Sequence, residues 1–104
     1  MKRAPSAFAE RCYALLREVP EGKVTTYGEI ARALHTKAWR AVGHAMSINP
    51  YMPEVPCHRV IRSDGRMGGY AFGADKKAAL LRAEGVHIVD GKIAASAIYH
   101  FSDT

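Results

Sequence analysis

The chain has 104 residues, 48% of them hydrophobic and 24% charged, which is the composition of one globular domain (residues 1–104) with a modest core. The formal net charge is +5, and residues 32–66 carry six basic side chains against two acidic ones, which is typical either of a polyanion-binding surface or of a solvated face that maintains solubility. No apolar run approaches the roughly 18 residues of a membrane span, and the N-terminus has no apolar signal core, so we expect a cytoplasmic protein, or a nuclear one in a eukaryote.

The N-terminal part of the chain predicts a helix followed by a short strand. Ser6 is expected to cap the helix. Residues 20–22, Pro-Glu-Gly, end it, and the β-prone residues 23–25 predict a small strand. The apolar side chains that share one helical face are Phe8, Cys12, Leu15, Leu16 and Val19.

Two further helices follow in close succession. The spacing of Thr26 and Glu29 is that of a capping box, and it predicts a second helix that buries Ile30, Ala31 and Leu34. Thr36 is expected to cap a third helix over residues 37–48. Its apolar stripe would be Trp39, Val42 and Met46, and its other face, polar or small throughout, would be Arg40, Gly43, His44 and Ser47.

Two short helices with a tight connection are typical of a helix-turn-helix, although an ordinary helical hairpin has the same pattern. Small residues at Gly43 and Ala45 favour the helix-turn-helix, because they permit close approach to a partner.

The second half of the chain predicts short strands and one more helix. Three prolines between Asn49 and Pro56 exclude a helix. Residues 57–62 predict a strand, 63–66 a turn and 67–70 a returning wing strand. Asp75 is expected to cap a fourth helix that packs Ala78, Leu80 and Leu81 inward and ends at Gly85, and residues 86–93 predict a hairpin. The predicted fold is therefore mainly α with short β, a winged helix-turn-helix in a single domain.

Cys57 is the candidate reactive residue. A thiolate is the nucleophilic form of cysteine, and the neighbouring His58 favours its formation. In one extended strand the two side chains would point to opposite faces, so either the backbone turns there or a water joins them. Glu84 is the candidate acceptor that orients His58. The alternative is that Cys57 is a small buried hydrophobe, as we expect for Cys12, and both thiols are expected to be free.

Other kinds of site find no support in the sequence. The five histidines and two cysteines include no C-x-x-C or H-x-x-x-H pair, so no metal site is expected. No glycine-rich phosphate loop precedes a helix, and no signature of a cysteine protease is present.

Several blocks in chain order resemble the O6-alkylguanine-DNA alkyltransferase family, the methylated-DNA–protein-cysteine methyltransferases. The resemblance covers roughly residues 8–90, and its Pro-Cys-His-Arg block with an asparagine eight residues before the cysteine is highly specific. It extends only to the C-terminal, DNA-binding and catalytic domain of that family. The blocks are Val24–Ala31, Arg40–Met46, Asn49-Pro50, Pro56–Val60, Gly69-Tyr70 and Leu80–Gly85.

The resemblance implies transfer of an alkyl group from O6 of guanine in double-stranded DNA to Cys57, once per molecule and without a cofactor. It implies that His58 takes the thiol proton through a water and that Glu84 orients His58. Tyr27 would donate a proton or a hydrogen bond to N3 of the leaving guanine. Asn49 would brace the turn that leads to the active-site segment.

The resemblance also implies how the DNA is held. O6 of a paired guanine lies inside the duplex, so the nucleotide must be flipped out, and Arg40 would take its place in the stack. The third helix would then lie in the minor groove, and the protein would act as a monomer. The residues expected at the DNA are Arg40, Thr26, Tyr27, Ala41, Gly43, Ser47 and Arg59. Those expected at the base-binding pocket are Val60, through its carbonyl, and Tyr70, Ala71 and Phe72.

Two positions depart from the family pattern. Ala71 stands where the family often has serine, and Phe72 stands where many members have a small residue. Phe72 either points into the pocket and narrows it against adducts larger than methyl or ethyl, or packs against the fourth helix near Leu80.

Three other functions fit parts of the sequence. Alkyltransferase-like proteins are similar single domains that bind alkylated guanine and flag it for other repair, with tryptophan or another residue in place of the cysteine. A plain winged-helix regulator or architectural protein would leave Tyr27, Arg40, Asn49 and Cys57 without a joint role. The third alternative is that the chain is a fragment, or one half of a methylation-sensing regulator.

Overall fold

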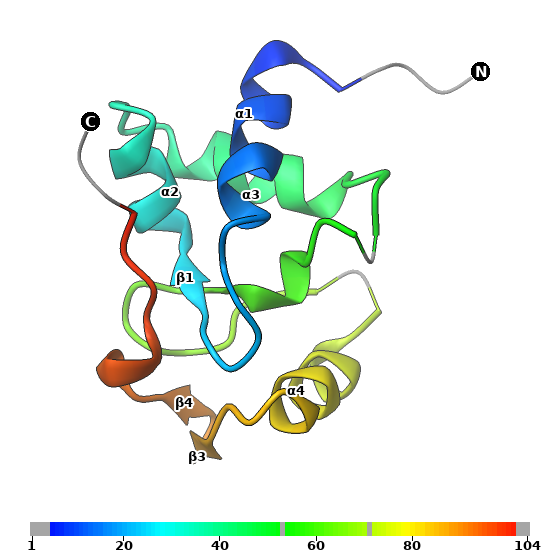
Figure 1. The fold of residues 1–104 in the computed structure, drawn as a ribbon, viewed down its shortest axis with the longest axis vertical. Coiled ribbons are helices and arrows are strands. Elements are labelled where there is room, and N and C mark those ends of the chain that lie inside the picture. The colour runs from blue at the N-terminus through cyan, green and yellow to red at the C-terminus, as the bar shows by residue number, and fades with distance from the viewer. Residues whose placement is uncertain (1–4, 53, 71, 102–104) are drawn as a thin grey trace.

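The computed structural model describes residues 5–52, 54–70 and 72–101, and within these ranges the protein is mainly helical with short strands, as predicted (Figure 1). None of the described helices is long and apolar enough to cross a membrane. The helices are α1 (Ala7–Leu16), α2 (Tyr27–Ala33), α3 (Trp39–Ser47) and α4 (Ala74–Ala83), with short 3₁₀ helices η1 (Cys57–Arg59) and η2 (Ala95–Ala97). The strands are β1 (Thr25–Thr26), β2 (Val60–Ile61), β3 (Ile88–Val89) and β4 (Lys92–Ile93).

A short parallel pair, β1 with β2, divides the hydrophobic core in two. Thr25 pairs with Val60 and Thr26 with Ile61. Because successive side chains of a strand point to opposite faces, Val60 joins the cluster formed with α1, α2 and α3, whereas Ile61 joins the cluster formed with α4 and the hairpin. In Figure 1 helices α1, α2 and α3 lie in the upper half of the molecule, and α4 with the hairpin lies in the lower half.

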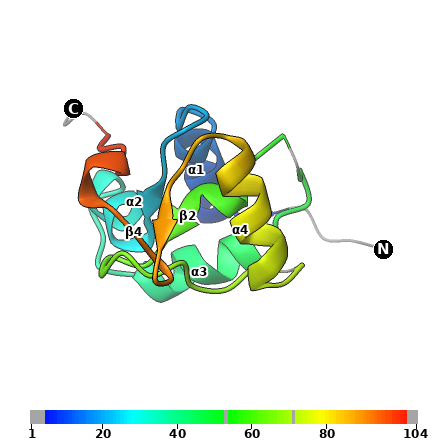
Figure 2. The ribbon, with the colours of Figure 1, turned by 90° about the horizontal axis from the view of Figure 1, so that it is seen from below.

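Helices α1, α2 and α3 pack together as the helix-turn-helix part of the fold. Ser6 caps α1 by accepting from the Ala9 amide at 3.1 Å, and Thr26 caps α2 by accepting from the Glu29 amide at 2.9 Å, as predicted. The Tyr13 hydroxyl donates to the Ala45 carbonyl at 2.7 Å and so ties α1 to α3. Seen from below, α3 lies along one edge of the molecule, which leaves its outer face open (Figure 2).

The start of α3 differs from the prediction. The helix begins at Trp39, and the Thr36 hydroxyl accepts from the Ala38 amide at 3.1 Å in the turn before it, so Thr36 does not cap the helix. Val42 and Met46 are buried as expected. Trp39 is 54% exposed, because it stands in the first turn of α3, where the helix extends past the core that Val42 and Met46 cover.

Three further predictions about the second half of the chain were wrong. Residues 57–62 form a 3₁₀ turn followed by a two-residue strand, not one strand, and residues 67–70 form no strand, although Arg66 makes a single bridge to Lys92. Asp75 does not cap α4, whose N-cap is Gly73 with a φ of 94°. The hairpin β3–β4 is present as predicted, as is the left-handed Gly85 (φ 94°) after α4.

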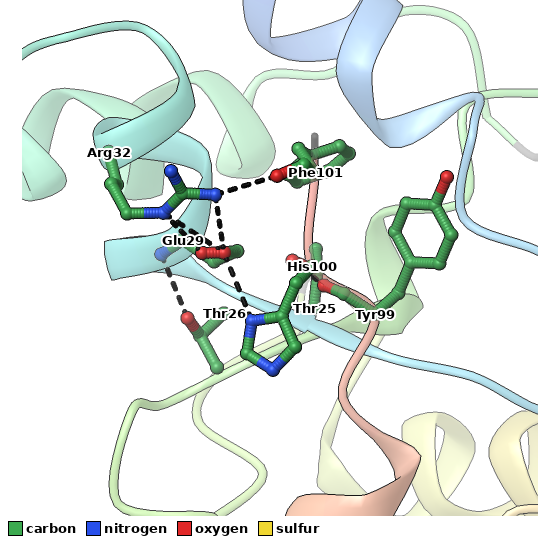
Figure 3. A network of polar contacts seen from close by, with 7 residues as sticks. All are labelled: Thr25, Thr26, Glu29, Arg32, Tyr99, His100 and Phe101. Carbon is green, nitrogen blue, oxygen red and sulfur yellow. Dashed lines mark hydrogen bonds and ion pairs between the residues drawn. The ribbon is translucent and has the colours of Figure 1, made fainter. Parts of the chain in front are cut away.

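The C-terminal segment, residues 94–101, fastens β1 and α2 (Figure 3). The Tyr99 amide donates to the Val24 carbonyl at 2.6 Å, and the Thr25 hydroxyl donates to the Tyr99 carbonyl at 3.2 Å. Arg32 donates to the Phe101 carbonyl at 2.8 Å and to the Glu29 carboxylate, which also contacts His100 Nδ1 at 3.2 Å. Glu29 is thus used to hold the C-terminal segment.

Candidate active site around Cys57

Cys57 lies at a cavity of about 320 Å³ between α2, α3 and the loop that follows β2. Pockets of this size are at the small end of those that bind organic ligands, and two aromatic rings in the wall suit a flat base. The thiol is 7% exposed, so it reacts only with a group that enters the cavity. The lining residues are Tyr27, Gly43, Met46, Ser47, Cys57, Gly69 and Tyr70.

The backbone turns at Cys57. The Cys57 amide donates to the Val55 carbonyl, and the Arg59 amide donates to the Pro56 carbonyl, both at 2.9 Å. This 3₁₀ turn is the first of the two alternatives left open by the sequence, because Cys57 and His58 are not in an extended strand. The thiol Sγ lies 3.0 Å from Met52 Sδ, a contact that the sequence did not indicate.

Asn49 closes the proline-containing segment that leads into this turn. Its side-chain amide donates to the Val55 carbonyl at 2.8 Å, and its oxygen accepts from the Tyr51 amide at 2.9 Å. The side chain is 9% exposed, and it also hydrogen-bonds Cys57. One asparagine therefore sets both the path of the segment and the position of the thiol.

The two cysteines lie in different environments. Burial raises the pKa of Cys57 above its ordinary value, against the opposing effects of the Asn49 hydrogen bond and the Lys77 charge. Burial raises the pKa of Cys12 to about 11, and Cys12 is fully enclosed between α1 and the core. Cys12 is thus the inert core thiol expected, whereas Cys57 is a protonated thiol that needs a base on entry of a substrate.

The candidate base, His58, is the next residue in the chain. His58 is 7% exposed, and its Nε2 lies 2.9 Å from Glu84 Oε2 at the end of α4. Burial acts to raise the pKa of Glu84, but the hydrogen bonds from Arg59 and His58 outweigh it and lower the pKa. An ionised carboxylate only accepts hydrogen bonds, so Nε2 of His58 carries the proton and Nδ1 is left as the basic atom.

Arg59 completes this network and does not face outward. Its Nε and Nη2 donate to the two Glu84 oxygens at 2.9 and 2.7 Å, and Nη1 donates to the Val19 carbonyl at 2.9 Å. Its side chain is only 13% exposed. Arg59 was predicted to contact DNA, and in the structure its guanidinium makes a two-pronged internal pairing with Glu84.

Tyr27 forms one wall of the cavity from the first residue of α2. Burial first, and the nearby Cys57 second, raise the pKa of its phenol, so the hydroxyl stays protonated and is able to donate. Two glycines leave room around its ring. A Cβ built at Gly68 meets the Tyr27 hydroxyl at 3.7 Å, and one at Gly43 meets ring atom Cε1 at 4.0 Å.

Lys77 is a site residue that the sequence analysis missed. It is fully buried, and its Nζ donates to the carbonyls of Val60 at 2.6 Å, Met67 at 2.5 Å and Gly69 at 3.1 Å. Burial lowers its pKa to about 8, so at neutral pH it keeps the three N–H groups that these carbonyls need. Its position four residues before Leu81, on the inward face of α4, was the available signal.

The remaining predicted pocket residues are placed differently. Tyr70 lines the cavity, but Val60 is in the core and its carbonyl accepts from Lys77. Phe72 is 64% exposed and packs edge-on against Tyr70 with ring centroids 5.7 Å apart. It neither lines the cavity nor belongs to the core, which corrects both alternatives for this residue. Ala71 lies outside the described residues.

The residues expected at the DNA divide into two groups. Arg40, Ala41 and Ser47 are exposed on α3, and Gly43 and Ser47 also line the cavity. Thr26, also predicted to contact DNA, is 6% exposed, and its hydroxyl caps α2. Within the described ranges, no three of His, Cys, Asp and Glu come together as a metal site would require.

Comparison with known proteins agrees with this geometry. A family model for the 6-O-methylguanine DNA methyltransferase DNA-binding domain matches residues 7–86. The chain is 47% identical over 88 residues to the methylated-DNA–protein-cysteine methyltransferase of Methanosarcina acetivorans, a match that covers 82% of this chain and 56% of that protein. It is 41% identical to Mycobacterium tuberculosis OGT, solved with DNA, with a TM-score of 0.75 over 78% of this chain and 51% of that one.

Another solved structure matches over nearly its whole length. Atl1 of S. pombe, in complex with damaged DNA that contains O6-carboxymethylguanine, is 32% identical, with a TM-score of 0.80 over 93% of this chain and 98% of that one. By contrast, the chain spans about half the length of the methyltransferases just named. The extent of the family match and these identities show that the chain belongs to the family of 6-O-methylguanine DNA methyltransferase DNA-binding domains.

Proposed function

We propose that this protein repairs DNA by transferring an alkyl group, methyl in the simplest case, from O6 of guanine to Sγ of Cys57. The observation that carries the proposal is the placement of Cys57 at a cavity between Tyr27 and Tyr70, directly before a histidine held by an ionised carboxylate. A buried cysteine with a structural role needs neither the cavity nor the base.

The chemistry follows from the positions of these groups. The Cys57 proton passes through a water to Nδ1 of His58, while Nε2 keeps its hydrogen bond to Glu84. The thiolate then attacks the alkyl carbon, so that a carbon–sulfur bond forms and the carbon–O6 bond breaks. Tyr27 donates toward N3 of the guanine as negative charge develops on the departing base. The product is a thioether, which has no proton to lose, so each molecule acts once and no cofactor is consumed.

The outer face of α3 supports the proposed way of reaching the base. A flipped nucleotide leaves a gap in the stack, and Arg40 is an exposed side chain in the first turn of α3 that is long enough to fill it. Ala41, Gly43 and Ser47 are small, which permits α3 to approach the floor of the minor groove closely. We propose that one chain binds one damaged site as a monomer. It would work where the chromosome lies, in the cytoplasm or in a nucleus.

The likeness to Atl1 over nearly its full length favours a second candidate, a protein that binds alkylated guanine without transferring the group. The two functions differ at Cys57. They are separated by the intact mass of the protein after incubation with duplex DNA that contains O6-methylguanine.

Transfer adds one methyl group per chain in wild type and none in Cys57→Ala. Cys12→Ala is the matched control, and it should still gain the methyl group because Cys12 is enclosed in the core. Tight binding to the damaged duplex with no added mass in wild type would overturn the transfer proposal in favour of the second candidate.

A further inference from the structure

Trp39 is exposed in a place where a DNA-binding domain has a use for an aromatic ring. It is the single tryptophan of the sequence, it opens α3, and it is 54% exposed. An isolated exposed hydrophobic side chain is ordinary and carries no argument by itself. What distinguishes Trp39 is the shape and charge of the surface around it.

Two hollows lie beside the Trp39 ring. One, of about 350 Å³, is lined by Tyr27, Gly28, Trp39, Arg62, Ser63 and Asp64. The other, of about 330 Å³, also includes Tyr27, Trp39 and Arg62 and adds Arg40, Gly43, Gly68 and Gly69. We call the two together the Trp39 groove.

The Trp39 groove adjoins the cavity at Cys57. Tyr27, Gly43 and Gly69 line both the second hollow and that cavity, so the two spaces share a wall. An occupant of the groove would therefore be the immediate neighbour of a base in the cavity.

The charges around the groove favour an anion, and its walls favour a flat ring. The Arg40 guanidinium lies 5.2 Å from the centroid of the Trp39 ring, which is cation–π distance. The Arg62 side chain is 56% exposed, and Asp64 lies 3.5 Å from it, so the groove holds two arginines and one carboxylate. Insertion of Arg40 into DNA would draw it away from the indole and free one face of the ring for stacking.

From this arrangement we infer that the Trp39 groove is a second nucleotide site: when the chain binds DNA, the groove takes a nucleotide next to the position that faces the Cys57 cavity. The ring of that nucleotide stacks on the indole, and Arg62 faces its phosphate. Stacking on an aromatic side chain does not depend on which base is present, which suits a protein that must act in any sequence. This inference rests on the proposed function only in requiring that the chain binds DNA.

The test uses the indole as its own reporter. Undamaged duplex DNA is titrated into the wild-type protein while tryptophan emission is followed, and the anisotropy of the same DNA, labelled, is measured in parallel. We expect saturable quenching of the emission with the Kd given by anisotropy, and protection of the indole from acrylamide in the complex. Trp39→Ala should weaken duplex binding about tenfold, and Trp39→Phe, which keeps a stacking ring, should recover most of that loss.

Val89→Ala is the matched control for loss of an exposed hydrophobic side chain. Val89 is 68% exposed on β3, in the part of the molecule away from α3, and its replacement should leave DNA affinity unchanged (Figure 1). Duplex binding without a change in indole emission, or a Trp39→Ala variant that binds like wild type, would overturn the inference.

The outcome is separable from that of the transfer proposal, because undamaged DNA offers no alkyl group. An indole that responds to DNA in a protein that gains no methyl group overturns transfer alone. Methyl transfer by a protein whose tryptophan emission does not change on DNA binding overturns the second nucleotide site alone.

Discussion

The two sides of Cys57 differ in how deeply their side chains are buried and in how fully their polar groups are paired. On the inner side, His58, Arg59, Glu84 and Lys77 are buried or nearly so, and each polar group has a partner; among the described residues no buried side-chain nitrogen or oxygen lacks one. On the outer side, α3 presents Trp39 and Arg40, which are exposed, and the Arg40 guanidinium lies over the Trp39 ring. Under the proposed function, the inner side would fix the geometry of the chemistry, and the outer side would be free to rearrange on DNA.

This difference predicts that substitutions on the inner side cost stability, whereas those on the outer side cost only DNA-dependent function. Four substitutions test it, in order of decreasing effect on the free energy of unfolding.

Glu84→Ala should have the largest effect. It leaves the mostly buried Arg59 guanidinium without its carboxylate and His58 without an orienting acceptor, and breaking such a pair costs about 3 kcal/mol. Transfer should also fall to background, because His58 loses the partner that fixes its tautomer. Urea unfolding and the rate of mass gain measure the two effects.

Glu21→Ala is the matched control, since Glu21 lies 4.0 Å from the same Arg59 but is 79% exposed. It should change stability by less than about 0.5 kcal/mol. Equal losses of unfolding free energy in Glu84→Ala and Glu21→Ala would show that the burial of Glu84 does not determine its contribution to stability.

Lys77→Met should destabilise by about 2 kcal/mol, because three carbonyls around the site lose their donor. It also has a signature that a purely structural role would lack. The positive charge of Lys77 lowers the pKa of Cys57, so its removal should raise that pKa further above the ordinary value of 9.0. The rate of iodoacetamide alkylation of Cys57 should therefore reach its midpoint at a higher pH in the variant.

Lys76→Met, on the exposed side of α4, is the control for both measurements. If Lys77→Met loses stability but the pH dependence of Cys57 alkylation is unchanged, the role of Lys77 is only to hold the loop that follows β2.

Glu29→Gln should cost about 1.5 kcal/mol at neutral pH, because the buried carboxylate accepts from Arg32 and contacts His100. The hydrogen bond from Arg32 is the main cause that lowers the pKa of Glu29 below its ordinary value of 4.5. A lowered pKa in the folded state contributes stability above pH 4.5, which is lost as the pH falls through the folded value. The difference between wild type and variant in urea unfolding should thus shrink below pH 4.5, while the exposed Glu18→Gln shows no such trend.

Arg40→Ala should have the smallest effect on stability, within about 0.5 kcal/mol, because the side chain is exposed. It should slow transfer from duplex DNA far more than transfer from the free base O6-methylguanine, which needs no flipping. A parallel loss on both substrates would mean that Arg40 is not the residue that fills the gap.

The inner side of the site was largely predictable, because its residues stand in recognisable sequence blocks and form a known combination of nucleophile, base and orienting carboxylate. Cys57, His58 and Glu84 were named from such blocks, and the contact between His58 and Glu84 is present. Lys77 was missed because a lysine in a helix is usually solvated, and only its register with Leu81 indicates that it points inward. The pairing of Arg59 with Glu84 was missed for the converse reason, because a basic residue beside a reactive cysteine resembles a phosphate contact.

The outer side was less predictable because its details depend on where a helix starts. Helix α3 begins at Trp39 and not at residue 37, a difference of two residues that periodicity does not resolve, and Trp39, predicted on the apolar stripe, is 54% exposed. The predicted wing strand over 67–70 failed for another reason. The carbonyls of Met67 and Gly69 are directed to Lys77, so they are not available to a β-ladder.

The contacts of the C-terminal segment have a consequence for the biosynthesis of the protein. The bonds from Thr25, Glu29 and Arg32 to residues 99–101 span 74, 71 and 69 positions of the chain. On a ribosome, β1 and α2 emerge long before the residues that fasten them, and Tyr27 begins the fastened helix. The wall that Tyr27 forms is therefore fixed only after residues 99–101 have emerged, so a nascent chain that already carries Cys57 still lacks one fixed wall of the cavity at that residue. Contacts of such separation also slow folding, which makes this step a candidate for the late event in assembly of the domain.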